Sequence, residues 1–234
     1  MIKINNITKS FGNFYALRGI DLQILPGEFW IIVGPNGAGK TTLLKILSTL
    51  SKPTNGKIEI DSNAPNPSNL QIRKQIGFIG HQSFLYGNLT AEENLKFYAN
   101  MYGLKNIKEV IINKLSRVGL YDRRDDLVRN FSRGMQQRLT IVRALLTNPK
   151  VVLLDEPFSG LDQKGIDFFS NLLTSLITPE RIIIMTTHNL YLGWELATNY
   201  AILNNGKIVE KNKRGKINFE KFKILYREKT GDSN

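Results

Sequence analysis

The sequence predicts an α/β domain with a mainly parallel core sheet. Two observations support this fold class: short apolar runs typical of strands buried on both faces, and segments of helical periodicity that separate them. The runs are Phe29–Val33, Ile76–Ile79, Val151–Leu154 and Arg181–Thr187. Buried strands that alternate with helices favour a parallel sheet, because parallel neighbours need a long crossover connection.

Composition excludes several classes of protein. The chain has 234 residues, no cysteine and two histidines. Disulfide scaffolds, thiolate zinc sites, iron–sulfur clusters and cysteine nucleophiles are therefore excluded, and a reducing compartment fits. The formal net charge of +12 suits anionic partners such as nucleotide, acidic lipid or nucleic acid, although solubility alone also explains it.

The first part of the chain predicts strand, strand, turn, strand, loop and helix. Two strand-like stretches, Ile2–Ile7 and Leu17–Ile24, are separated by the turn residues Phe11-Gly12-Asn13. A glycine-rich loop follows the first buried strand. A helix is expected from Lys40 until Pro53 ends it. Its apolar stripe comprises Leu43, Leu44, Leu47 and Leu50.

The middle of the chain predicts a helical insertion between strands, over about 83–148. Before it, Asp61–Leu70 reads as an irregular surface loop. Within it, Thr90-Ala91-Glu92-Glu93 fits a capping box at the start of one helix. A second helix is expected over Ile107–Val118, with Gly119 as its stop.

The last third predicts a helix, a hairpin and a basic tail. Ile166, Phe169, Leu173 and Leu176 have helical spacing, and Asn204-Asn205-Gly206 is typical of a hairpin turn. From Lys207 to Lys229 the chain is strongly basic. This stretch could contact acidic lipid headgroups, but a solvated charged face is the commoner explanation. We expect the tail, about 211–234, to fray.

One loop carries the clearest chemical signal, Gly34-Pro35-Asn36-Gly37-Ala38-Gly39-Lys40-Thr41, followed by Thr42. It fits the P-loop pattern between a predicted strand and a predicted helix. Its glycines let backbone N–H groups close around phosphates, Lys40 adds a full positive charge, and the Thr41 hydroxyl can bind magnesium. An ordinary glycine-rich turn is the alternative, but chance gives this pattern in only roughly one such chain in a hundred. We expect residues 34–42 to bind nucleotide.

Two carboxylates follow a buried strand and complete this chemistry. Asp155 is expected to orient magnesium, since a P-loop needs a carboxylate at the end of a neighbouring strand. Glu156 comes next. Adjacent carboxylates at the end of a sheet are costly unless cation and water share the site, so Glu156 is the candidate for polarising an attacking water.

A further motif carries a family resemblance. Phe131-Ser132-Arg133-Gly134-Met135, followed by Gln136-Gln137-Arg138, is similar to the Leu-Ser-Gly-Gly-Gln signature of ATP-binding-cassette (ABC) transporters. With the P-loop, the chain resembles the nucleotide-binding subunit of these transporters over about 2–209. The resemblance implies a single domain, 1–234: a P-loop NTPase core with a mainly parallel sheet, an N-terminal antiparallel β subdomain and the inserted helical subdomain.

The resemblance implies roles for the signature residues. Ser132 and Gly134 match the pattern and would bind the γ-phosphate of ATP held by an opposite subunit. Arg133 and Met135 depart from it. A helix N-cap is the structural alternative for Ser132, and both can hold at once.

Other residues gain roles only from the resemblance. Gln82 resembles the glutamine that approaches magnesium and the attacking water, and His188 resembles the switch histidine at the γ-phosphate. Ser159-Gly160-Leu161-Asp162 resembles the D-loop, where a plain turn is the alternative. Phe11 resembles the aromatic residue that stacks on adenine, although Tyr15 or core packing could also explain the aromatic residues there.

The function implied is hydrolysis of ATP with Mg²⁺ by two such domains, identical or not, paired head to tail. The apolar runs are far shorter than the roughly 20 residues of a membrane-spanning helix, so a separate transmembrane permease subunit is expected. It would dock beside Gln82 and the helical insertion. We expect a peripheral protein at the cytoplasmic face of the membrane, without a nucleic-acid partner.

Two alternative functions remain, and one motif indicates a direction of transport. A soluble cassette acting on ribosomes or DNA would also be basic, and a regulatory module would bind ATP without splitting it. Gly80-His81-Gln82 is similar to the ATPase of the haem exporter used in cytochrome c maturation, which favours export. A solvent-facing loop histidine is the alternative for His81.

Overall fold

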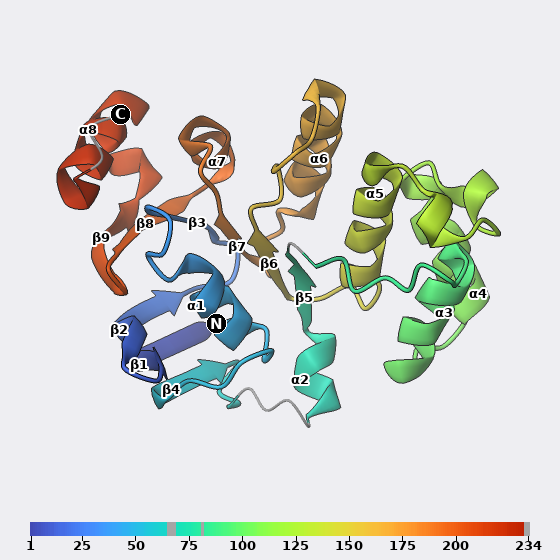
Figure 1. Ribbon diagram of the computed structural model, residues 1–234, viewed down its shortest axis with the longest axis horizontal. Coiled ribbons are helices and arrows are strands. Elements are labelled where there is room, and N and C mark those ends of the chain that lie inside the picture. Colours follow the sequence, from blue (N-terminus) through green and yellow to red (C-terminus); the bar gives the residue numbers. More distant parts are fainter. Residues whose placement is uncertain (65–68, 81, 232–234) are drawn as a thin grey trace.

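Two β-sheets and the helices around them form the structure, a computed structural model that describes residues 1–64, 69–80 and 82–231 (Figure 1). The strands are β1 (Ile2–Phe11), β2 (Phe14–Ile24), β3 (Phe29–Val33), β4 (Asn55–Ile60), β5 (Ile76–Ile79), β6 (Val151–Asp155), β7 (Ile182–Thr186), β8 (Asn199–Asn204) and β9 (Lys207–Lys213). The helices are α1 (Lys40–Leu47), α2 (Leu70–Lys74), α3 (Ala91–Met101), α4 (Ile107–Arg117), α5 (Arg133–Ala144), α6 (Gln163–Leu176), α7 (Leu190–Leu196) and α8 (Phe219–Thr230). Short 3₁₀ turns cover Tyr121–Arg123, Val128–Asn130 and Arg214–Lys216.

The main sheet has the order β5-β6-β7-β3-β8-β9, and the smaller sheet has the order β2-β1-β4. Neighbours in the main sheet are parallel except for the β8–β9 hairpin, and the smaller sheet is antiparallel. Every residue of β3, β6 and β7 is buried, as their apolar sequences predict. The mainly parallel core and the antiparallel N-terminal sheet are confirmed.

Two apolar cores cover the two faces of the main sheet. On one face, α1 and the three-stranded sheet pack against residues such as Ile32 and Leu153. On the other face, α5, α6, α7 and α8 pack against residues such as Ile31 and Leu154. Figure 1 shows these layers on opposite sides of the central strands. Adjacent residues of one strand thus serve different cores, as the period of two requires.

The helical insertion packs as an arm beside β5. α3, α4 and α5 enclose a third core, and α5 also contributes Ile141 and Ala144 to the main-sheet core. The Thr90 capping box is present, with the Glu93 N–H donating to Thr90 Oγ1 at 3.1 Å. The insertion is less helical than expected, because the chain between α4 and α5 forms only two 3₁₀ turns.

The expected end of the first helix is wrong. α1 ends at Leu47, six residues before Pro53, and Leu50 is 51% exposed instead of lying on the apolar stripe. The Leu50 N–H donates to Lys45 O at 2.9 Å, and the Thr49 N–H donates to Ile46 O at 3.1 Å. This is a Schellman motif in which Thr49 takes the left-handed position, with φ of +65°, that glycine normally occupies.

The expectation that the tail frays is also wrong. α8 packs on the main sheet, and Phe222 is fully buried between Trp194 and Tyr200, at ring-centroid distances of 4.6 and 5.0 Å. Asn218 caps the helix by accepting from the Lys221 N–H, and Gly231 ends it in the left-handed conformation.

The expected loop at Asp61–Leu70 falls partly outside the described residues. Helix α2 begins at Leu70, the last residue of that expected loop.

The strands at the N-terminus are longer than predicted. β1 and β2 continue to a tight turn at Gly12 and Asn13, so Phe11 and Phe14 pair across it.

Among the described residues, no helix combines the length and the apolar character needed to cross a membrane.

Candidate active site

The P-loop joins the end of β3 to the start of α1 and fits against its surroundings only with glycine at two positions. A Cβ at position 34 would lie 2.0 Å from Leu203 O, and a Cβ at position 39 would lie 2.5 Å from Ala16 O. Gly39 also has φ of +107°. The loop is therefore pressed between β8 and β2, which fixes where its backbone N–H groups lie.

The β8–β9 hairpin supports the same loop. Asn205 and Gly206 both have positive φ, as a two-residue type I′ turn requires. The Gly206 N–H donates to Ala38 O at 3.0 Å, and the Arg18 N–H donates to Gly206 O at 2.8 Å. The predicted hairpin thus contacts the P-loop at Ala38 and β2 at Arg18.

Lys40 is buried at the start of α1, with 6% of its surface exposed. Its Nζ donates to Gly34 O at 2.7 Å and to Pro35 O at 3.0 Å. Burial lowers the pKa of the Lys40 ammonium, and the nearby Glu156 and Asp155 carboxylates oppose that shift. The Gly34 and Pro35 carbonyls hold the Lys40 ammonium at the P-loop, where it could also contact an anion bound to the loop.

Asp155 ends β6 and is 3% exposed. Its Oδ1 accepts hydrogen bonds from Thr41 Oγ1 at 3.0 Å and from Thr186 Oγ1 at 2.7 Å. The sequence analysis missed Thr186. Its signal was a polar residue at the end of a buried strand, but only the pairing of Asp155 with Thr186 across β6 and β7 identifies its partner.

These oxygens fit a magnesium ion. Carboxylate and hydroxyl oxygens are hard ligands, and Mg²⁺ usually takes one or two protein ligands beside water and phosphate oxygens. Asp155 and Thr41 supply such a pair. Among the described residues there is no cluster of three or more histidine, cysteine or acidic side chains that could hold a metal without other ligands.

Glu156 and His188 face one another across the ends of β6 and β7. The His188 N–H donates to Glu156 Oε2 at 3.0 Å, and His188 Nε2 lies 3.1 Å from Glu156 Oε1. Glu156 has φ of +53°, and its N–H donates to Thr186 O at 3.1 Å. Its buried Oε1 accepts no hydrogen bond from the described residues. Glu156 lines a cavity of about 220 Å³ together with Asp155.

Of the signature segment, Arg133 lines this cavity, but the two residues expected to bind nucleotide, Ser132 and Gly134, do not. Ser132, Gly134 and Asp162 line a second cavity of about 460 Å³. Ser132 Oγ accepts from the Met135 N–H at 3.3 Å, which confirms the N-cap. Asp162 Oδ1 accepts from the Gly165 N–H at 2.8 Å and caps α6. No described hydrogen bond links these three residues to the P-loop, and no P-loop residue lines the cavity that they share.

Three other residues predicted from the sequence to bind nucleotide or magnesium have no described hydrogen bond to the P-loop, Asp155 or Glu156. Gln82 is exposed, and no described hydrogen bond links it to Asp155 or Thr41, although its neighbour Ser83 lines the first cavity. The Phe11 ring is 57% exposed, with Lys9 Nζ 5.0 Å from its centroid. Tyr15 is also exposed. His81 lies outside the described residues.

Comparison with known proteins identifies the family to which a chain with this site belongs. A family model described as "ABC transporter" matches residues 17–159. The chain belongs to the ABC transporter family. The match spans the P-loop, the signature segment, Asp155 and Glu156, whereas Thr186 and His188 lie beyond it.

Individual relatives agree along nearly the whole chain. The arginine transport ATP-binding protein ArtM of Bacillus subtilis is 33% identical over 217 residues, which cover 90% of each chain. The lantibiotic transport ATP-binding protein SrtF of Streptococcus pyogenes is 35% identical over 221 residues, 94% of each chain. A solved dimer of the ATP-binding cassette MJ0796 in a post-hydrolysis state, bound to ADP and Pi, is 30% identical with a TM-score of 0.82, covering 92% of this chain and 99% of that one. This ABC-family chain is an ATPase.

Proposed function

We propose that the chain is the subunit of an ABC transporter that hydrolyses ATP to move a substrate through a separate transmembrane subunit. The main support for this proposal is that five side chains expected to act on ATP come together at the ends of β3, β6 and β7. They are Lys40, Thr41, Asp155, Glu156 and His188. In open parallel sheets, ligands bind at the carboxyl ends of the strands.

Phosphate binding falls to the P-loop. Its backbone N–H groups and the N-terminus of α1 attract the phosphates. Lys40 exchanges its two carbonyl partners for phosphate oxygens, a charge-assisted contact that is stronger than a neutral hydrogen bond. Thr41 and Asp155 would hold Mg²⁺, which neutralises phosphate charge when bound.

Hydrolysis falls to Glu156 and His188. Glu156 lines the cavity, and its buried Oε1 accepts no described hydrogen bond and has His188 Nε2 3.1 Å away, so the carboxylate would accept a hydrogen bond from a water and orient that water. The water oxygen bonds to the γ-phosphorus, the bond to the ADP oxygen breaks, and the proton passes to the carboxylate. His188, 50% exposed in its side chain, is placed to contact the γ-phosphate.

A second copy, or a close relative of this domain, would complete the site. Ser132 and Gly134 sit at the N-terminus of α5, where partial positive charge attracts an anion, yet they line a different cavity from Glu156. A head-to-tail pair lets each α5 face the other chain's P-loop. The dimeric solved relative supports this arrangement.

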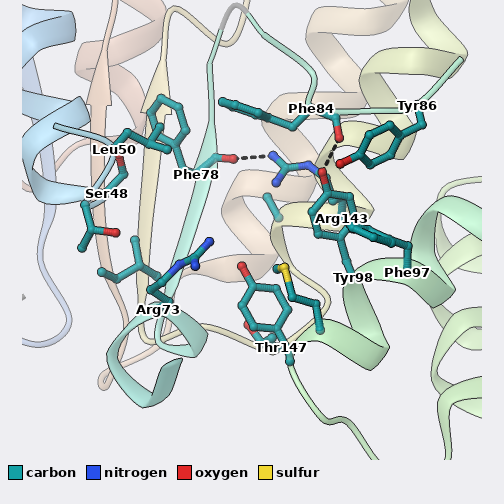
Figure 2. A pocket seen from close by; sticks show the side chains of 15 residues that line it. Ser48, Leu50, Arg73, Phe78, Phe84, Tyr86, Phe97, Tyr98, Arg143 and Thr147 are labelled. Carbon is teal, nitrogen blue, oxygen red and sulfur yellow. Dashed lines mark hydrogen bonds between the residues drawn. The ribbon is translucent and has the colours of Figure 1, made fainter. Parts of the chain in front are cut away.

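A groove beside the helical arm is our proposed docking site for the transmembrane subunit. It has a volume of about 450 Å³ and lies between the end of α1, α2, β5, α3 and α5. Figure 2 shows Arg143 beside Phe84 and Tyr98, with its Nη2 donating to Phe78 O at 2.7 Å. Tyr98 OH donates to Phe84 O. Aromatic side chains and two arginines thus line a groove that has no described acidic residue.

This groove fits an amphipathic segment that carries a carboxylate. Apolar residues would enter the aromatic part, and an acidic side chain would pair with Arg73 or with Arg143, whose Nε has no described partner. Docking there would hold the chain at the cytoplasmic face of a membrane. Export is the direction that the sequence favours, and ATP-dependent uptake into inside-out vesicles tests it.

The replacement Glu156→Gln tests the function. ATP affinity should persist, magnesium-dependent phosphate release should fall at least 100-fold, and a nucleotide-dependent dimer should accumulate in size-exclusion chromatography. Glu195→Gln, an exposed carboxylate on α7, is the matched control and should hydrolyse ATP at the rate of the unmodified chain. Near-normal turnover in Glu156→Gln would contradict the role of Glu156. An unmodified chain that binds ATP without releasing phosphate would favour the regulatory-module alternative.

A further inference from the structure

The Arg133 side chain lies directly against Gly160. A Cβ at position 160 would lie 2.1 Å from Arg133 Nη2, 2.4 Å from Cζ and 2.6 Å from Nη1. Gly160 also has φ of +71°. The guanidinium therefore occupies the space that any side chain at position 160 would need, and only glycine allows both the backbone conformation and the contact.

Arg133 forms a wall shared by two cavities. One cavity contains Asp155 and Glu156, and the other contains Ser132 and Gly134. In the described part of the chain, no hydrogen bond or ion pair involving the Arg133 side chain occurs, so its tie to Gly160 is packing alone. The side chain thus stands between the proposed water-orienting carboxylate and the proposed binding element for another chain's nucleotide.

The segment that Arg133 touches is continuous with Glu156. The Ser159 N–H donates to Glu156 O at 3.1 Å, and the Leu161 N–H donates to Phe158 O at 3.3 Å, so consecutive turns lead from Glu156 to Gly160. Gln137 Nε2 donates to Pro157 O at 3.4 Å. Gln137 and Arg133 are four residues apart on α5 and lie on one face of the helix. They contact the two ends of this segment.

We propose that Arg133 is a positioning residue that holds segment 157–161 against α5. Through this contact, engagement of a nucleotide at Ser132 and Gly134 is transmitted to the orientation of Glu156 in the same chain. The inference rests on the proposed function, which assigns those two elements. It gives a role to a side chain at which the sequence departs from the family signature.

A double-mutant cycle in ATP hydrolysis tests this link. Arg133→Ala should lower kcat about 5- to 20-fold and leave KM within about twofold, because Lys40 and Thr41 are untouched. Gly160→Ala should also lower kcat, since its Cβ displaces the guanidinium. In the Arg133→Ala background the same glycine substitution should cost at least about threefold less, because contacting residues are not additive. Asp167→Asn removes an exposed charge on α6 outside both cavities and should change neither constant.

Hydrogen–deuterium exchange tests the contact without relying on activity. Arg133→Ala should speed exchange of the Ser159 and Leu161 amides at least about threefold, whereas Asp167→Asn should not, and circular dichroism checks that each variant is folded. Unchanged exchange in Arg133→Ala, kcat within twofold of the unmodified chain, or an equal effect of Gly160→Ala in both backgrounds would overturn the proposal. An unmodified chain without ATPase activity would instead contradict the proposed function, and the exchange result would still decide the role of Arg133.

Discussion

At the scale of single residues, the site is a set of buried charges whose partners are already in place. Burying a charge is costly unless hydrogen bonds compensate it. Lys40 Nζ has two carbonyl acceptors, and Asp155 Oδ1 has two hydroxyl donors. Glu156 is the exception, because its buried Oε1 accepts no described hydrogen bond and lies 3.1 Å from His188 Nε2. The group left unsatisfied is the one that would contact water during hydrolysis.

The Lys40 ammonium gives a prediction at this scale. Lys40→Ala removes a charge-assisted contact worth about 1.5–3 kcal/mol, so the Kd for ATP should rise about 10- to 150-fold in titration calorimetry. Lys45→Ala, an exposed lysine in the last turn of the same helix, is the control and should bind ATP as the unmodified chain does. Equal affinities for the Lys40→Ala variant and the unmodified chain would exclude a phosphate contact by Lys40.

Residues that belong to a recognisable motif could be identified from the sequence, whereas partners that lie outside any motif or depart from its pattern could not. The P-loop and the Asp155–Glu156 pair stand out because their spacing and position after apolar runs carry the signal. Thr186 needed the β6–β7 register, and Arg133 needed the crossing of α5 over segment 157–161. The sequence contains both residues but not the tertiary contact that gives each a partner.

At the scale of elements, local signals predicted helix starts better than helix ends. Thr90 caps the start of α3 in a capping box, which its sequence pattern predicts. The end of α1 could not be predicted in this way, because its Schellman motif has threonine in place of the usual glycine. The basic composition after Lys207 concealed α8. What orders α8 is aromatic packing against α7: Phe222 stacks on Trp194, whose ring lies 5.8 Å from the Arg214 guanidinium.

α8 and Arg214 brace the element that follows His188. Arg214 Nη1 donates to Trp194 O and to Glu195 O, both at 2.6 Å, at the end of α7. α7 begins at Leu190 with Asn189 as its N-cap, directly after His188. The C-terminal segment therefore fixes the far end of a short helix whose near end carries a candidate catalytic side chain.

Phe222→Ala should destabilise the protein by about 3–5 kcal/mol, because a fully buried aromatic ring leaves a cavity behind. Urea unfolding followed by tryptophan fluorescence measures this, with Trp194 as a reporter at the site. Ile224→Ala, whose side chain is 56% exposed on the same helix, should change the free energy of unfolding by less than about 1 kcal/mol. Equal effects of the two substitutions would mean that α8 does not pack as described.

At the scale of the whole molecule, apolar surface gathers where the helical arm meets the main sheet. Leu50, Tyr86, Phe97 and Met101 line the docking groove, and each is at least 36% exposed. Contiguous apolar patches are uncommon on monomeric proteins and mark interaction sites. The same groove touches α1, which begins in the P-loop, and β5, which precedes Ser83 in the cavity lined by Asp155 and Glu156. A partner seated there could sense nucleotide binding through two elements at once.

Phe97→Glu tests this surface. A carboxylate among the aromatic side chains would have to be desolvated when an apolar segment docks, which costs several kcal/mol, enough to abolish a complex of micromolar affinity. We expect the tagged variant to fold, with an unchanged circular dichroism spectrum, and to lose its membrane partner in purification from solubilised membranes. Ile177→Glu places the same charge on an apolar side chain that is 41% exposed after α6, and should retain the partner. Loss of the partner in both variants would point to charge in general, and retention in both would exclude the groove as the docking site.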